Sequence, residues 1–210
     1  MKRKLLAAVL VAAMVVSLAA CGETGSDSEA GSGNSDSSQA SSGDSGSSSD
    51  ATFEAEADEN GNYVVNGSFE EVDFTGWNVT NIDGVTEELD IYTRETDCYD
   101  GVQSLHFYSG SNDINFTAEQ TLTGLEEGSY KLTGYIQGDT AGDEDASIYF
   151  YAIIDGETYT VDTTLNGYVN WNTAELGDLE VTNGEITIGV SVTIAPGGWG
   201  TIDNITLVKE

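Results

Sequence analysis

The stretch GEITIGVSVTIA, residues 184–195, decides the fold class, because apolar side chains occupy every second position in it. These apolar residues are all β-branched: Ile186, Ile188, Val190, Val192 and Ile194. Between them lie threonine, glycine and serine. Successive side chains of a β-strand point to opposite faces of the sheet, so the pattern predicts a strand with one buried face.

Shorter segments of the same kind recur on both sides of this stretch, separated by Gly, Asn and Asp. The strand-like runs are Ser104–Tyr108, Ala118–Leu122, Ser129–Gln137, Ser147–Ile154, Thr158–Thr163 and Thr201–Val208. Asp155-Gly156 and Asn183-Gly184 are turn signals between successive runs. No window shows a convincing helical period. We therefore predict that residues 61–210 form one all-β domain, an antiparallel β-sandwich of the jelly-roll type.

The N-terminus has the pattern of a bacterial export signal. Three basic residues at positions 2–4 precede an apolar run over residues 5–16, which is shorter than the roughly 20 residues of a spanning helix. The small residues 18–20 then lead into Cys21. We expect residues 1–20 to be a lipoprotein signal peptide and Cys21 to be lipidated, which places the protein on the outer face of the cell membrane. The alternative is an ordinary signal peptide followed by a chance cysteine.

The segment after Cys21 has the composition of a linker. Residues 22–50 are rich in Ser and Gly and contain no aromatic or large aliphatic side chain, and residues 51–60 add acids without a base. Such a sequence cannot bury enough apolar surface to offset its ordering entropy. Residues 22–60 are therefore predicted to be a disordered linker.

The charge balance excludes whole classes of partner. The net charge is −31 for the full chain and becomes −34 once the three bases of residues 1–20 are removed. A chain this acidic repels nucleic acid and anionic lipid headgroups, so contact with the membrane is expected through the lipid anchor only. A neutral ligand or a cation remains compatible with the charge. With Cys21 lipidated, Cys98 has no disulfide partner, and we expect it to be a semi-buried structural residue of a monomer.

Alternation also sorts the other side chains of the predicted strands. If Leu105, Phe107 and Ile136 point into the core, aromatic and planar polar residues gather on the opposite face. These residues are His106, Tyr108, Tyr135, Gln137, Tyr149 and Tyr151. Exposed aromatic clusters mark interaction sites, and sugars pack their C–H faces on aromatic rings while planar amides and imidazoles bind their hydroxyls. A slip of one residue in register would invert every assignment.

Two segments that contain glycine and polar residues add aromatic side chains to this set. Residues 167–172 contain Asn170 and Trp171 but have too many polar and Gly residues for a core strand, and residues 195–200 contain Trp199. Both tryptophans are candidate sugar-stacking residues, and each could instead close an end of the sandwich. Trp77 is expected in the core.

Taken in order, the motifs of residues 63–210 resemble those of carbohydrate-binding module family 61, the non-catalytic module of bacterial endo-β-1,4-galactanases. The more particular motifs are Leu105-His106-Phe107, Tyr135-Ile136-Gln137-Gly138, Val169-Asn170-Trp171 and Gly198-Trp199-Gly200-Thr201. The opening Asn66–Glu70 and closing Ile202–Ile205 are shared widely among jelly-roll sugar modules. The resemblance implies a sandwich that binds β-1,4-galactan and holds a structural Ca²⁺ ion. We expect that no galactanase accompanies the module and that the lipid anchor and linker take its place.

The resemblance also implies where calcium would bind. Ca²⁺ takes six to eight oxygen ligands, and in related jelly rolls it ties the first strand to the last. Here Glu70 and Asp203 occupy those positions, and Asp97 or carbonyl groups near residues 101–103 would complete the shell.

Two other classes of function were weighed. A glycosidase needs two carboxylates about 5–10 Å apart, and the 27 acids after residue 60 supply such pairs by chance on any fold. Catalytic triad, zinc and phosphate-loop motifs are missing, so we do not expect an enzyme. A protein-binding adhesin or scaffold module is the stronger competitor, since fold does not fix function. Among sugars, xylan would use the same residue types as galactan.

Overall fold

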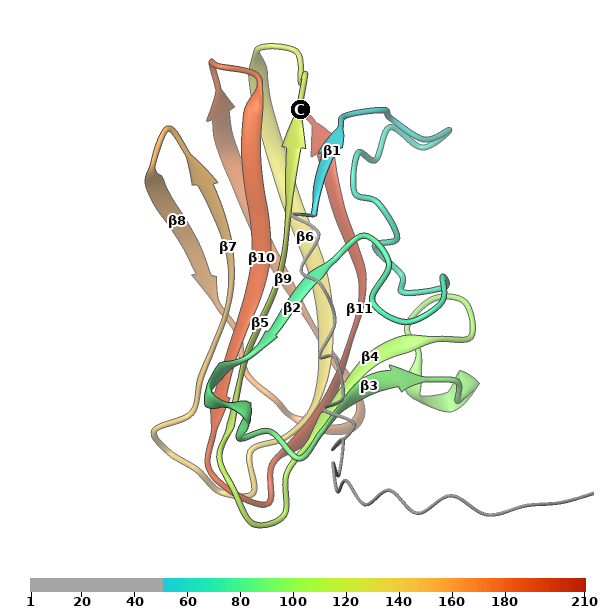
Figure 1. Cartoon of the computed structure of the whole chain (residues 1–210), viewed down its shortest axis with the longest axis vertical. Helices are drawn as coiled ribbons and strands as arrows, with labels where there is room; N and C mark the ends of the chain where they lie inside the picture. Colours follow the sequence, from blue (N-terminus) through green and yellow to red (C-terminus); the bar gives the residue numbers. More distant parts are fainter. Residues whose placement is uncertain (1–50) are drawn as a thin grey trace, which may run out of the picture. The chain divides into compact units, whose positions relative to one another are not determined.

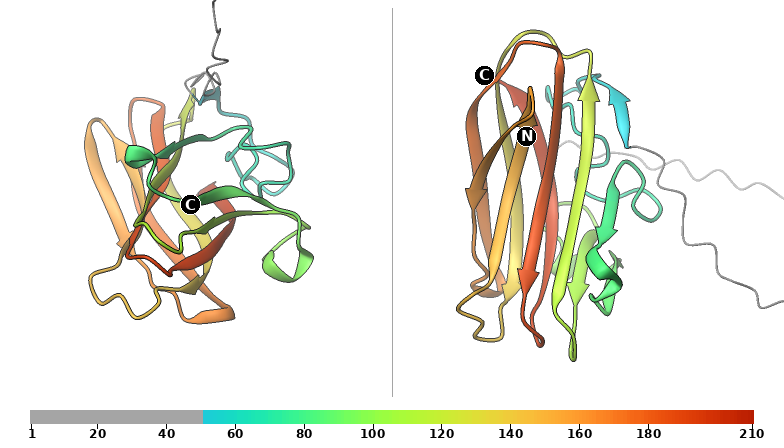
Figure 2. Two further views of the ribbon diagram at one scale, coloured as in Figure 1. Left: turned by 60° about the horizontal axis from the view of Figure 1, so that its bottom comes forward. Right: turned by 60° about the vertical axis from the view of Figure 1, so that its left-hand side comes forward.

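The computed structural model describes residues 51–210. The predicted signal peptide, the predicted lipidation site Cys21 and the predicted linker as far as residue 50 lie outside the described residues. Within them the chain folds into two β-sheets with two short 3₁₀ turns, η1 (Ile82–Gly84) and η2 (Glu95–Asp97). The predicted all-β sandwich is confirmed (Figures 1 and 2).

The first sheet has six strands and contains the alternating stretch at its centre. Its strands are β1 (Thr52–Glu54), β2 (Asn78–Asn81), β5 (Ile114–Thr123), β7 (Ser147–Ile154), β8 (Glu157–Asp162) and β10 (Glu185–Ile194). They are ordered β1-β5-β10-β7-β8, and β2 also pairs with β5. Only β1 pairs in parallel, with β5; the other pairings of this sheet are antiparallel.

The second sheet has five strands and is antiparallel throughout. Its strands are β3 (Glu88–Tyr92), β4 (Ser104–Tyr108), β6 (Gly128–Asp139), β9 (Gly167–Val181) and β11 (Trp199–Lys209), ordered β3-β4-β11-β6-β9. The loop between β3 and β4, residues 93–103, extends from the side of the sandwich and carries η2 (Figure 1).

The core forms where the inward faces of the two sheets meet. Phe107 of β4, Phe116 of β5 and Phe150 of β7 are completely buried, and the Phe107 and Phe116 ring centroids lie 5.4 Å apart. Trp77 is buried as predicted and stacks on Phe69. Burial of such side chains at roughly 25 cal/mol per Å² is the main stabilising contribution to the sandwich.

The structure corrects two boundaries predicted from the sequence. Thr52–Glu54, placed in the linker, forms β1 and pairs with Thr121–Thr123, so the folded domain begins before residue 61. Gly167–Asn172, interpreted as a loop, begins the long strand β9. Strand β9 lies at the edge of its sheet, where many of its side chains are exposed, and its sequence therefore lacks the apolar alternation of a central strand.

Residues 51–210 contain every strand described above together with the core that the two sheets enclose. This fragment is therefore expected to fold alone, and the experiments below use it. In this part of the chain, no helix has both the length and the apolar character needed to cross a bilayer.

Gly134→Ala is expected to destabilise the fragment by about 1–3 kcal/mol, because a Cβ at this buried position of β6 would overlap the Phe150 ring. Urea unfolding measures the loss. Gly177→Ala on β9 is the matched control, since its Cβ would meet only ordinary contacts at 3.6 Å or more. Equal stability of the two variants would show that the Gly134 position is not tightly packed.

Candidate functional site

The outer face of the five-stranded sheet collects most of the candidate residues. Leu105 and Phe107 point into the core, so His106 and Tyr108 of β4 point outward as predicted. Cross-strand pairing then places Thr201 of β11 between His106 and Gln137 of β6. Trp199 pairs in the same way with Tyr108. Three strands thus bring four predicted site residues onto one face.

This face holds a cavity of about 450 Å³. It is lined by aromatic rings together with charged and hydroxyl side chains: Glu88, Tyr92, Arg94, Asp97, His106, Tyr108, Tyr168, Trp199 and Thr201. Tyr168 is half exposed, and its ring centroid lies 6.3 Å from that of Trp199. The combination of flat apolar surfaces with hydrogen-bonding groups is typical of small-molecule and sugar sites.

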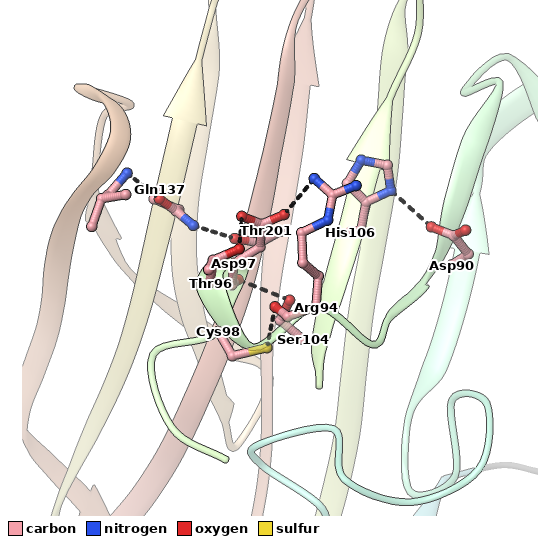
Figure 3. Close-up of polar contacts among 10 residues, drawn as sticks. Asp90, Arg94, Thr96, Asp97, Cys98, Ser104, His106, Gln137 and Thr201 are labelled. Carbon is pink, nitrogen blue, oxygen red and sulfur yellow. Dashed lines mark hydrogen bonds and ion pairs between the residues drawn. The ribbon is translucent and has the colours of Figure 1, made fainter. Parts of the chain in front are cut away.

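His106 forms part of the cavity wall but is more buried than the sequence suggested, at 4% exposure. The Tyr92 ring stacks on it at 3.5 Å between centroids, and Asp90 Oδ1 lies 2.8 Å from its Nδ1 (Figure 3). An ionised carboxylate can only accept, so Nδ1 donates to Asp90, and in the neutral imidazole Nε2 is then an acceptor. Burial raises the pKa of the Tyr92 hydroxyl.

An ion pair from the 93–103 loop also lines the cavity. Arg94 Nη1 is 3.1 Å from Asp97 Oδ2 (Figure 3). The guanidinium carbon of Arg94 lies 5.3 Å from the centre of the Tyr92 ring. The Asp97 side chain is buried, whereas Arg94 is two-thirds exposed. The pair therefore offers donors and acceptors with little net charge. Neither Tyr92 nor Arg94 was identified from the sequence, because neither belongs to an aromatic or glycine-flanked motif.

Gln137 does not face solvent as predicted. It is completely buried; its Nε2 donates to Thr201 Oγ1 at 3.1 Å, and its Oε1 accepts from the Val169 backbone N–H. Val169 has φ +60°, an unfavourable conformation for a β-branched residue, beside a register shift between β6 and β9. Gln137 thus fixes the bulge that places Tyr168 over the cavity, and its amide is not available to a ligand.

A second aromatic group lies on the same face. The Tyr99 and Tyr135 rings stack at 3.7 Å with 14° between their planes, and Trp171 meets Tyr99 edge-on at 5.6 Å. The neighbouring Tyr99 raises the pKa of the Tyr135 hydroxyl. Tyr99 was missed from the sequence, because it lies between Cys98 and Asp100 and is not flanked by glycine on both sides as Trp199 is.

Tyr149 and Tyr151 do not belong to this face. They lie on β7 of the other sheet. There the buried Tyr151 ring packs over Gly189 of the neighbouring strand β10, and its hydroxyl donates to Glu119 Oε2 at 2.7 Å. Burial raises the pKa of the Tyr151 hydroxyl. The sequence assigned each strand an outward face correctly but could not show that the faces belong to opposite sheets. Asn170 is exposed, and its Nδ2 donates to the carbonyl of Asn166, the residue that precedes β9.

The three predicted calcium ligands separate into two groups. Glu70 and Asp203 hold the same loop: Glu70 Oε1 accepts from the N–H groups of residues 102 and 103, and Asp203 Oδ2 from those of residues 99 and 100. Asp97 instead pairs with Arg94. Within residues 51–210, no group of three or more His, Cys, Asp and Glu side chains is placed to hold a metal. Glu70, from the segment before β2, and Asp203 of β11 still fit as two ligands from separate parts of the chain, whereas Asp97 does not, because it is paired with Arg94.

Burial raises the pKa values of two side chains at this loop, those of Asp203 and Cys98. It raises the pKa of the Asp203 carboxyl to about 7, although three backbone N–H donors act in the opposite direction. It also raises the pKa of the Cys98 thiol to about 11. Cys98 is semi-buried, as expected, and a thiol that stays protonated at neutral pH is a poor nucleophile.

Comparison with known proteins supports the fold. No protein-family model and no curated protein matches the sequence. Among solved structures, the chain is similar to the carbohydrate-binding module TmCBM61 in complex with β-1,4-galactotriose, with 24% identity, a TM-score of 0.63, and coverage of 71% of this chain and 99% of that one. It is also similar to the enzymatically active domain of bacteriophage CBA120 tailspike protein 4, with 16% identity, a TM-score of 0.53, and coverage of 71% and 22%.

The chain therefore has the β-sandwich fold of a carbohydrate-binding module. That fold also occurs within an enzymatically active domain, so function has to be argued from the site.

Gln137→Met is expected to destabilise the fragment by about 1–3 kcal/mol, because it leaves the Val169 N–H and the Thr201 hydroxyl without their partner. Urea unfolding again measures the loss. Gln103→Met is the control: that side chain is only partly buried and makes a single hydrogen bond, to the Glu70 carbonyl, so a smaller loss is expected. A Gln137→Met variant as stable as the wild type would contradict the positioning role.

Proposed function

We propose that the outer face of the five-stranded sheet binds a neutral glycan, and that β-1,4-linked galactan is the ligand. The observation that carries the proposal is the cavity, in which the Tyr168 and Trp199 rings lie close to the Arg94–Asp97 ion pair and to His106. The aromatic rings provide surfaces for the C–H faces of a sugar. The ion pair and His106 Nε2 provide donors and acceptors for its hydroxyl groups.

The choice of galactan rests on two supports. One is the sequence resemblance to carbohydrate-binding module family 61, and the other is the fold shared with TmCBM61, which was solved with galactotriose. The charge of the domain favours a neutral ligand over an anionic one, since residues 51–210 contain 31 acids and three bases.

Binding without cleavage is part of the same proposal. A glycosidase needs one carboxylate as acid and another as base or nucleophile. Of the carboxylates at the cavity, Asp97 is paired with Arg94, and Asp90 lies beyond His106 as its hydrogen-bond partner. Apart from the paired Asp97, Glu88 is the one carboxylate among the described residues that lines the cavity, and one carboxylate does not supply both catalytic roles. We propose that a lipid anchor at Cys21 would hold this module at the outer cell surface, where it would capture polysaccharide.

Trp199→Ala is expected to weaken binding of debranched β-1,4-galactan by about 1–3 kcal/mol, as for a truncated aromatic anchor. Tyr168→Ala, which changes a half-exposed side chain, tests the same wall of the cavity with less risk to folding. Calorimetric titration measures both, and reducing ends should not increase during incubation. Tyr159→Ala, an exposed tyrosine of the other sheet, is the control. Full affinity in the Trp199 and Tyr168 variants would place the site elsewhere.

A structural calcium ion is the remaining part of the proposal, with Glu70 and Asp203 as its ligands. A cation there would join the chain near β11 to the segment before β2, so its removal should destabilise the fold. We expect the fragment to melt at a lower temperature in chelator than in calcium, and Glu70→Gln to reduce the difference. Identical melting curves in calcium and chelator would rule against this ion.

A further inference from the structure

The aromatic group formed by Tyr99, Tyr135 and Trp171 lies outside the cavity and is not explained by packing of the sandwich. Tyr99 belongs to the 93–103 loop on the outer face of the sheet, and 45% of its surface is exposed. One face of its ring is covered by Tyr135, while Trp171 meets it at 73°. The three rings therefore form a corner of aromatic surface that is open to solvent.

The position of Tyr99 is fixed by its backbone. Its N–H donates to Asp203 Oδ2 at 2.6 Å, and the next N–H donates to the same oxygen at 3.0 Å. Further along the loop, Glu70 Oε1 accepts two more N–H groups at 2.7 and 2.8 Å. A loop held by four hydrogen bonds to carboxylates presents its exposed ring in one place, so a ligand that stacks there loses little ordering entropy.

This corner adjoins the cavity through two chain segments. In the 93–103 loop, Asp97 lines the cavity and Tyr99, two residues later, belongs to the corner. At the start of β9, Tyr168 lines the cavity and Trp171, three residues later, belongs to the corner. The two surfaces are therefore parts of one continuous face.

Trp199 of the cavity and Tyr135 of the corner are attached farther apart than the length of one sugar ring. Trp199 pairs with Asp139 of β6, and Tyr135 lies four residues away on the same strand, about 13 Å at the rise of an antiparallel strand. Acidic side chains surround the corner, with Asp100 next to Tyr99 and Glu175 near Tyr135. An anionic chain would be repelled here, whereas a neutral glycan chain would not.

We infer that the corner formed by Tyr99, Tyr135 and Trp171 is a second contact surface for the same glycan chain, so that the module binds a run of several sugar residues more tightly than a short fragment. This inference rests on the proposed function of the cavity and adds a chain-length preference to it. The cavity would contact one part of the chain and the corner would stack a sugar ring further along it.

The experiment compares β-1,4-galactobiose with β-1,4-galactohexaose in calorimetric titrations. The wild-type fragment should bind the hexaose at least about tenfold more tightly than the biose, which corresponds to one added aromatic contact. Tyr99→Ala and Trp171→Ala should each remove most of that advantage and leave biose affinity unchanged. Tyr99→Phe, which retains the ring, should keep the advantage.

The outcomes separate the two proposals. Equal wild-type affinity for both lengths, or full hexaose affinity in both alanine variants, would overturn the second contact surface while leaving the cavity intact. Both surfaces would be supported if Trp199→Ala lowers affinity for the biose and the hexaose, while Tyr99→Ala lowers affinity for the hexaose alone. If neither oligosaccharide binds the wild type, the galactan proposal fails and the chain-length preference fails with it.

Discussion

Strand alternation is the constraint on which both the core and the candidate binding face depend. Because neighbouring side chains of a strand point to opposite faces, burying Leu105 and Phe107 places His106 and Tyr108 outside. The same constraint on β11 buries Ile202 against the core and leaves Thr201 on the outer face beside His106. A shift of one residue in the pairing of β4 with β11 would exchange the two sets. The packing that stabilises the sandwich therefore also assembles the cavity.

Loop residues as well as strand residues line the cavity, and buried polar side chains determine where the loops lie. Asp203 is fully buried, a position that is costly for a carboxylate unless hydrogen bonds compensate. Here it accepts three backbone N–H groups, two of them from the 93–103 loop. The buried Gln137 side chain likewise positions the start of β9, because its Oε1 accepts a hydrogen bond from the Val169 N–H. These two side chains place Arg94, Asp97, Tyr99 and Tyr168 around the floor formed by β4 and β11.

The cavity differs from the rest of this acidic domain because a positively charged side chain lines it. Arg94 is the single arginine after residue 60, and it lies at the cavity rather than on a solvent-exposed strand. Its pairing with Asp97 and its contact with Tyr92 hold the guanidinium in place. The pair keeps the site close to neutral in a strongly acidic protein. Hydrogen bonding and stacking, rather than long-range attraction, are the interactions that such a site offers to a ligand.

The sequence by itself determined the sandwich, most of its strands, and the outward direction of His106, Tyr108 and Tyr135, because the period-two pattern of a half-buried strand is local information. It also identified Trp171, in a segment of mostly polar residues, and the glycine-flanked Trp199 as candidate contacts. Only the tertiary structure separated Tyr149 and Tyr151 from the others, since alternation gives the face of each strand but not the sheet to which the strand belongs.

Other features likewise required the fold. The burial of Gln137 and the position of Tyr99 depend on contacts between residues far apart in the chain. The edge strand β9 was missed in part because a strand at the edge of a sheet does not need an apolar alternation. Local pattern thus determined the scaffold, and long-range hydrogen bonding decided which side chains meet at the site.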